Sequence, residues 1–452
     1  MRNQPPVAAG IQTVDYPAIP ETLLPNGLLV LTIEDSRFPI VSVQVGFPVG
    51  RVHNTDQNLS LLQLAVESAK DGTTSRTARQ IADQMDHWAI QYSSDLFMES
   101  TLHAIRVLEK HLERALDILS DVLLRPVFPE EELDKTRARW ASILQAQRSQ
   151  PEFLATERAY LTCFEGHPYA KNTIPLDHLL EATREGVRQS YAANYGPRGA
   201  ILLFAGAITH DRSVEMARRF FGDWDSASAE PVTYPSLPDL SSKRVLLVDR
   251  PKSVQTRILV ALRALAVTDP DMIALRVANQ VMGGGASARL FLKLREEKGY
   301  TYGAYSRLKS YKHGGLILAG AGVRSDVTRE SVDDLLQELT MMATGLPSEE
   351  ELSRSRSEII GAFIRQMETP TSIGGLELRR RLCGLPDDHY RTLPSRVQDV
   401  TPEKVREVSS RILEENRPAI IAVGDRQVIE NQVNHLGEVE VFTALGQKIG
   451  PE

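Results

Sequence analysis

The hydrophobic and polar positions along the chain follow two different spacings. Val41–Phe47 and Thr256–Leu265 are short, mostly apolar runs rich in β-branched residues, which is typical of buried strands. His111–Leu124 has apolar residues three and four positions apart, which predicts an amphipathic helix. Strands and helices follow one another without strict βαβ units. The pattern therefore predicts an α+β fold in which helices back a sheet.

The same pattern occurs twice along the chain. PEEELDKTRARW begins at Pro129 and PSEEELSRSRSE begins at Pro347, and each predicts a helix with acidic residues in its first turn. The aligned leucines, Leu133 and Leu352, stand 219 positions apart. Two later apolar strands end in glycines that stand 218 positions apart. Two matches at almost one offset indicate a duplicated domain.

A change in composition separates the two copies. Residues 225–243 contain three prolines and several serines, which predicts an extended linker. The predicted N-terminal domain covers residues 20–224, and the predicted C-terminal domain covers residues 244–438.

Composition excludes several classes of protein. The 452 residues are 42% apolar and 25% charged, with a formal net charge of −7, which argues against nucleic-acid binding. No apolar run approaches the ~18 residues of a membrane span. The first residues contain no apolar segment, so we expect no signal peptide, and the compartment stays open between cytoplasm and periplasm. Cys163 and Cys383 are too few for a disulfide framework and are expected to be buried as small apolar residues.

The sequence also argues against three common kinds of site. The glycines that begin at Gly283 follow the helical run Asp271–Met282, so they predict a helix end and close backbone packing rather than a dinucleotide loop. No GxSxG segment is present, and no two of the ten histidines are three or four residues apart. His167 is the histidine of most interest, and we interpret it as a residue that shapes the turn before Pro168.

Four segments together resemble the M16 (pitrilysin-like) family of zinc peptidases, of the M16B type with two homologous domains per subunit. They are RPVFPEEELDKTRARW, EGHPYAKNTI, GGGASARLFLKLREEKGYTYGAYS and CGLPDDHYRTLPSRVQDVTPEKV. The resemblance covers nearly the whole chain, from Leu23 to Asp425. It implies two homologous domains, each a mainly antiparallel sheet backed by helices, of the LuxS/MPP-like metallohydrolase type.

The zinc motif of this family is missing. Active members carry HxxEH on a helix of the first domain, with two histidine ligands and a glutamate that activates water. Counting back from the shared Gly-Thr pair places Gln63 and Glu67 at the histidine positions and Val66 at the glutamate position. The third ligand would fall near Ser142 or Ile143, neither of which is a carboxylate. We therefore expect no metal and no other cofactor in this chain.

The second half of the family's divided site is retained. In active members the second domain supplies an arginine and a tyrosine that bind substrate and the developing oxyanion, and the matching positions are Arg295 and Tyr302. A guanidinium is a permanent cation with forked donors, and a tyrosine hydroxyl can donate to a charge that forms in the transition state. Strand alternation would place Tyr300 and Tyr302 on one face, so Tyr300 is a second candidate.

The resemblance implies a non-zinc-binding subunit of a heterodimeric metallopeptidase. Its partner would be a homologous M16B subunit that carries HxxEH and zinc, and its substrate a peptide or an unfolded protein. Arg295 and Tyr302 would then act at the partner's site. One alternative is a catalytically inactive scaffold or binding subunit of a larger complex. The other is an active peptidase with displaced ligands, which the zinc content of the isolated chain would distinguish.

Overall fold

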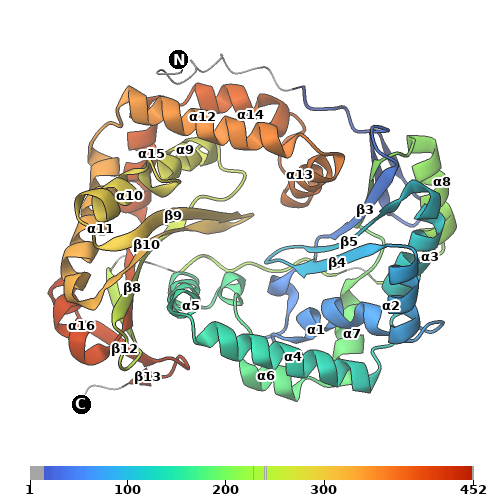
Figure 1. Cartoon of the computed structure of the whole chain (residues 1–452), viewed down its shortest axis with the longest axis horizontal. Helices are drawn as coiled ribbons and strands as arrows, with labels where there is room; N and C mark the ends of the chain where they lie inside the picture. Colours follow the sequence, from blue (N-terminus) through green and yellow to red (C-terminus); the bar gives the residue numbers. More distant parts are fainter. Residues whose placement is uncertain (1–14, 228, 239, 241, 450–452) are drawn as a thin grey trace, which may run out of the picture.

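Two β-sheets, each backed by helices, organise the molecule (Figure 1). The structure is a computed structural model that describes residues 15–227, 229–238, 240 and 242–449. Two parts of the sequence predictions lie outside this range. They are residues 1–14, where the sequence predicts no signal peptide, and positions 228, 239 and 241 of the predicted linker. The α+β fold that the sequence predicts is confirmed.

The first sheet has six strands in the order β1-β2-β6-β3-β5-β4. Only β2 and β6 run parallel, and the remaining pairs are antiparallel. The strands are β1 Glu21–Leu23, β2 Leu29–Glu34, β3 Ile40–Phe47, β4 Gln91–Leu96, β5 Thr101–Leu108 and β6 Ile201–Gly206. The helices of this half are α1 Leu61–Ser68, α2 Ala78–His87, α3 Leu112–Leu124, α4 Glu130–Arg148, α5 Pro151–Cys163, α6 Leu176–Glu181, α7 Arg184–Asn194 and α8 His210–Phe221.

The second sheet has seven strands in the order β13-β12-β7-β11-β8-β10-β9. They are β7 Arg244–Asp249, β8 Gln255–Ala264, β9 Thr301–Tyr311, β10 Gly314–Arg324, β11 Ala419–Gly424, β12 Val439–Thr443 and β13 Lys448–Ile449, so this sheet continues past residue 438, where the predicted domain ends. Its helices are α9 Met272–Gly283, α10 Arg289–Phe291, the π-helical turn η5 Leu292–Glu297, α11 Thr328–Thr344, α12 Glu349–Gln366, α13 Pro370–Cys383, α14 His389–Gln398, α15 Pro402–Glu415 and α16 Arg426–Val433.

The two sheets have the same strand order where the halves correspond. The series β2-β6-β3-β5-β4 in the first sheet repeats as β7-β11-β8-β10-β9 in the second. The helices α4 and α12, whose sequences carry the repeat, both begin with three glutamates in the first turn, as the sequence predicts. The strands β4 and β9 each pair on one side only within the described sheets, so each sheet has an open edge at its corresponding end.

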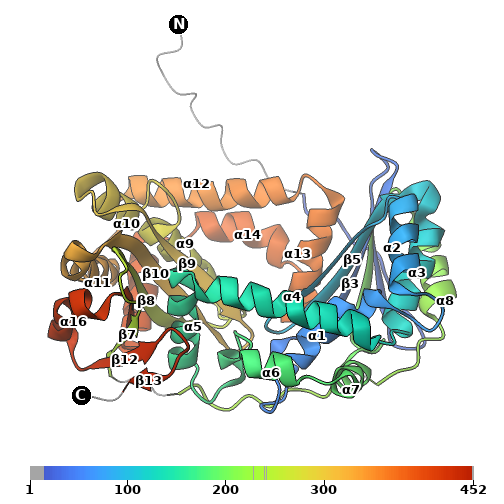
Figure 2. The same ribbon diagram turned by 60° about the horizontal axis from the view of Figure 1, so that its bottom comes forward.

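The two halves exchange one helix each. Helix α5, from the first half, packs on β8 and β11 of the second sheet, and α13, from the second half, packs on β6, β3 and β2 of the first sheet (Figures 1 and 2). Both helices begin with a proline at the first position, which suits the fixed backbone angle of that residue. Each sheet therefore buries one face against a helix from the other half, and the two halves share their cores.

Small residues allow the exchanged helix α13 to approach the first sheet closely. A Cβ atom added at Gly374 would lie 2.7 Å from Leu203 Cδ2, and one added at Gly46 would lie 3.2 Å from Leu378 Cδ2. Buried side chains of α5, such as Leu154 and Ala159, belong to the same apolar cluster as strands of the second sheet. Among the described residues, no helix is long and apolar enough to cross a membrane.

Candidate functional site

The helix α1 carries Gln63, Val66 and Glu67, the residues that the sequence analysis assigns to the positions of a zinc motif. Val66 is completely buried in the first core, and Gln63 is almost completely buried. The Gln63 side-chain amide donates to Glu67 Oε1 at 3.4 Å, one helical turn away. These three side chains therefore lie together as the sequence spacing predicts, but they present one carboxylate and one neutral amide.

An arginine from the neighbouring helix pairs with that carboxylate. Arg139 of α4 donates through Nη2 to Glu67 Oε2 at 3.1 Å. Burial raises the pKa of Glu67, and the positive charge of Arg139 opposes that rise. A cation therefore already balances the carboxylate in this place. Ser142 and Ile143 are exposed on α4, and the Ser142 hydroxyl bonds to the carbonyl of Ala138 in its own helix.

These groups do not fit a zinc ion. Zinc sites in proteins use several histidine, cysteine or carboxylate ligands, whereas the five positions assigned to the motif, Gln63, Val66, Glu67, Ser142 and Ile143, offer one carboxylate that is already paired. Within the described residues, no group of three or more such side chains is placed to hold a metal.

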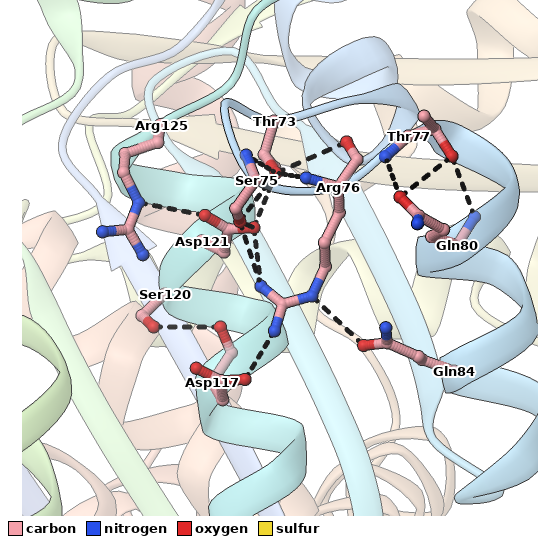
Figure 3. A network of polar contacts seen from close by, with 10 residues as sticks. All are labelled: Thr73, Ser75, Arg76, Thr77, Gln80, Gln84, Asp117, Ser120, Asp121 and Arg125. Carbon is pink, nitrogen blue, oxygen red and sulfur yellow. Dashed lines mark hydrogen bonds and ion pairs between the residues drawn. The ribbon is translucent and has the colours of Figure 1, made fainter.

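A polar network fixes the loop that follows α1 (Figure 3). The completely buried carboxylate of Asp121 on α3 accepts hydrogen bonds from the hydroxyls of Thr73 at 2.6 Å and Ser75 at 2.5 Å. Arg76 and Arg125 form ion pairs with the same carboxylate at 2.7 and 2.9 Å. Burial would raise the pKa of Asp121, but these donors hold it below its usual range. The network joins α3 to the start of α2 and thereby positions the end of α1.

Arg295 lies in a π-helical turn at the end of the short helix α10. Within η5, Lys298 N donates to Lys293 O at 3.1 Å, five residues back, and Gly299 then ends the turn with a φ of +63°. Such turns are rare and occur frequently at functional sites. The half-exposed guanidinium stacks on the Phe291 ring, with Cζ 4.7 Å from the ring centre.

Tyr302 projects from a bulge at the start of β9. Thr301 pairs with Val323 and Ala304 pairs with Ala321, so Tyr302 and the next residue together face one residue of β10. Bulges of this kind re-aim side chains. Tyr302 is 90% exposed, and its carbonyl accepts from Arg295 Nη1 at 3.1 Å. The arginine therefore binds the backbone that carries the tyrosine, and no described residue forms a hydrogen bond with the tyrosine hydroxyl.

The prediction that Tyr300 and Tyr302 share one strand face is wrong. Tyr300 precedes β9, which begins at Thr301, and it packs against the second core. The bulge interrupts the alternation on which the prediction relied. Of the two candidates, Tyr302 is almost fully exposed, whereas Tyr300 is partly buried.

The structure also contains a cavity of about 700 Å³ between the two halves. The exchanged helices α5 and α13, the turn between β4 and β5, and the part of β9 that begins at Tyr305 all contribute to its wall. Cys383 lines it and is only partly buried, contrary to the sequence prediction, whereas Cys163 is completely buried as predicted. Arg295, Tyr302 and the α1 residues lie outside this lining.

Arg51 is a lining residue that the sequence analysis does not identify. It follows β3 in the segment GFPVGRVHN, where nothing distinguishes it from a surface arginine. His167 takes the predicted role in a turn: its Nδ1 accepts from Tyr169 N at 3.2 Å and caps the short 3₁₀ turn Pro168–Ala170. It is buried, and burial lowers its pKa.

Comparison with known proteins identifies the family. A family model described as Insulinase (Peptidase family M16) matches residues 29–175, and one described as Peptidase M16 inactive domain matches residues 181–359. The chain belongs to the M16 peptidase family. An uncharacterized zinc protease of Streptomyces coelicolor is 24% identical over 410 residues, covering 89% of each chain.

Two further relatives are subunits of mitochondrial-processing peptidase. The human alpha subunit is 26% identical over 362 residues, which cover 72% of this chain and 67% of that protein. A probable beta subunit of Arabidopsis thaliana is 22% identical over 444 residues, covering 94% and 81%. These M16 relatives include chains described as proteases and chains described as subunits.

Solved structures of M16-type proteins share the whole fold. A peptidase M16 inactive domain from Pseudomonas fluorescens superposes with a TM-score of 0.84 at 19% identity and covers 90% of this chain and 98% of its own. A protease from Helicobacter pylori gives a TM-score of 0.83 at 16% identity, covering 90% and 99%. At these identities the likeness concerns the fold alone.

Proposed function

We propose that this M16 chain is the non-zinc-binding subunit of a heterodimeric zinc metallopeptidase. In this proposal it supplies Arg295 and Tyr302 to a peptide that is hydrolysed at the site of a homologous subunit carrying HxxEH. The observation that carries the proposal is the bulge that holds Tyr302 90% exposed beside Arg295. The relatives include an alpha and a beta subunit of mitochondrial-processing peptidase, which favours pairing of unlike chains.

The α1 region supports the first half of this proposal. Arg139 supplies a positive charge to Glu67, so that carboxylate does not depend on a metal for charge balance. Val66 has no acid–base chemistry, and its burial leaves no place for a water molecule at that side chain. Hydrolysis in this chain alone would therefore lack both a metal ligand set and a general base at these positions.

The Arg295–Tyr302 pair supports the second half. An exposed tyrosine hydroxyl without an internal partner can donate to an oxyanion as negative charge develops during attack on a peptide carbonyl. The guanidinium of Arg295 keeps its positive charge at any relevant pH and lies next to the Tyr302 backbone. Its interaction with the Tyr302 carbonyl holds the tyrosine in place before substrate arrives.

The proposal is tested by turnover of the assembled heterodimer. The chain is co-purified with its HxxEH-bearing partner, and kcat is measured for wild type, Tyr302→Phe and Arg295→Lys. Losing one preorganised donor costs ~3 kcal/mol of barrier, which corresponds to a decrease in kcat of about 100-fold. Tyr300→Phe is the matched control. It removes the hydroxyl of a tyrosine that packs against the second core, two residues before Tyr302, and kcat should be unchanged.

The alternatives give different results. Full turnover with both Tyr302→Phe and Arg295→Lys in a correctly assembled complex contradicts the proposal and favours the scaffold or binding subunit. Stoichiometric zinc in the isolated chain, together with peptide hydrolysis by it, would instead indicate an active peptidase with displaced ligands.

A further inference from the structure

Arg51 reaches into the cavity between the two halves without a counter-charge. It begins the 3₁₀ turn Arg51–His53 after β3, and its backbone N–H donates to Phe97 O at 2.9 Å. Its guanidinium donates through Nη1 to Asn172 O at 2.7 Å. Its Nε is buried without a hydrogen-bond partner, and no described carboxylate forms an ion pair with it.

A partly buried guanidinium in this state is costly, because its Nε is shielded from water. Burial lowers the pKa of Arg51, but an arginine side chain keeps its proton in proteins, so the charge remains. An uncompensated buried charge is among the strongly destabilising arrangements in a fold. The open volume next to it provides room for an anion that would supply the missing charge.

Two tyrosine hydroxyls extend the polar surface around Arg51. Tyr160 from α5 and Tyr311 from β9 both line the cavity, and their hydroxyl oxygens are 2.6 Å apart. Both interact electrostatically with Arg51. Their mutual hydrogen bond uses one of the two hydroxyl hydrogens, so the other can be donated to a ligand. The site thus combines a cation with a free O–H donor.

The acidic residues of the cavity are already engaged elsewhere. Glu99 accepts from the Tyr169 hydroxyl at 2.6 Å and from the backbone N–H of Lys312 at 3.1 Å. Glu152 pairs with Arg257 and accepts from the Tyr305 hydroxyl. Neither of them forms an ion pair with Arg51, so its guanidinium can pair with an anion from outside the chain.

The cavity wall also favours an extended ligand. Among the described strands β9 pairs only with β10, so an extended peptide could pair along its other edge. Ser306 O already accepts from Asn279 and Tyr311 O from Val267 N, so the peptide would use the remaining backbone groups. Further along the wall, Arg307, Lys309 and Arg379 are exposed cations. These features together suit a peptide with negative charge better than one with positive charge.

We propose that Arg51, with the Tyr160–Tyr311 hydroxyl pair, binds a carboxylate of a peptide held in the cavity between the two halves. The carboxylate is either a C-terminal one or the side chain of an acidic residue, since both present two oxygens to a forked guanidinium. The choice of a peptide as ligand rests on the proposed function. The site itself lies entirely within this chain.

The test measures peptide binding by the full-length chain without a partner. Three fluorescein-labelled twelve-residue peptides share one uncharged body of alanine, serine and leucine. One ends in a free carboxylate, one has an amidated end and a central glutamate, and one has an amidated end and a central glutamine. Fluorescence anisotropy should give at least ~10-fold tighter binding for one of the charged peptides than for the neutral peptide, as expected for charge-assisted hydrogen bonds. The better of the two charged peptides identifies the source of the carboxylate.

Substitutions locate the effect. Arg51→Gln should abolish the preference for the charged peptide, and Tyr311→Phe should weaken it. Arg307→Gln, which removes an exposed cation from the same wall, should keep most of it. Arg51→Met serves as a second variant: because it removes a partly buried charge that has no ion-pair partner, its thermal midpoint should be at least that of wild type.

Several outcomes overturn the proposal. The proposal is wrong if wild type binds all three peptides equally. It is also wrong if Arg51→Gln or Arg51→Met still binds the charged peptide more tightly than the neutral one. A clearly lower thermal midpoint for both Arg51 variants would show that an internal group already balances the charge. The Arg295 and Tyr302 turnover assay is independent of these measurements, so either proposal can fail while the other stands.

Discussion

The stability of the first half should depend on pH through one buried histidine. His103 on β5 is completely buried, and the Tyr92 hydroxyl lies 2.7 Å from its Nδ1. Its Nε2 has no hydrogen-bond partner among the described residues, and the rings of Phe47 and Tyr195 pack against the imidazole edge to face. Protonation would place a charge and an unpaired N–H in the core. Burial accordingly lowers the pKa of His103 from 6.5 to about 3.

The sign of the effect follows from proton uptake. Above pH 6.5 the histidine is neutral in both states and has no effect on the free energy of unfolding. Between pH 6.5 and about 3 the unfolded chain binds a proton that the folded chain does not, so stability falls as the pH is lowered. The slope approaches ~1.4 kcal/mol per pH unit, which amounts to about 2 kcal/mol lost at pH 5.

The assay is urea unfolding of the isolated chain at pH 7, 6 and 5, for wild type and His103→Gln. Other groups also titrate over this range, so the informative quantity is the difference between the two proteins. Wild type should lose about 2 kcal/mol more than His103→Gln between pH 7 and pH 5. His87→Gln, at an exposed histidine, should follow wild type. Parallel losses in wild type and His103→Gln would refute the reasoning.

Three further substitutions examine a buried ion pair and the packing of two helices. Arg380→Ala leaves the almost completely buried Glu377 with one fewer cation, and should lower the free energy of unfolding by ~3 kcal/mol in a urea titration. Gly283→Ala places a Cβ 2.3 Å from Ser306 N and should cost about 2 kcal/mol. Gly361 lies inside α12, and a Cβ added there would meet the Arg365 side chain at 3.7 Å, which is ordinary contact. Gly361→Ala should therefore raise the free energy of unfolding by up to ~1 kcal/mol. Equal effects of the two glycine substitutions would contradict this account.

Local patterns were sufficient to predict several parts of the fold. Gly283, the first residue of GGGASAR, ends α9, as the helical pattern of the preceding residues predicts. Because Gly283 has no side chain, β9 can approach the end of this helix closely. The acidic first turns of α4 and α12 mark real helix starts. Gln63, Val66 and Glu67 lie on one helix at the expected spacing. In each case neighbouring residues in the chain decide the outcome.

The candidate site was less predictable because its geometry depends on distant residues. Strand alternation assigns Tyr300 and Tyr302 to one face, but pairing with β10 introduces a bulge that separates them. The partner of Glu67 is Arg139, 72 positions away on another helix. No local pattern identifies Arg51, because an arginine after a strand is ordinarily a surface residue.

The sequence by itself predicted a duplicated α+β domain, placed Gln63, Val66 and Glu67 together on one helix, and placed Arg295 and Tyr302 at a helix-to-strand turn. These features depend on residue identity and on spacing within single elements. Only the tertiary structure decided that α5 and α13 exchange places, and this exchange brings both helices to the wall of the cavity. The apolar face of a helix requires burial, but its sequence does not specify which sheet will cover it. The unpaired charge of Arg51 likewise results from side chains that meet only in the folded chain.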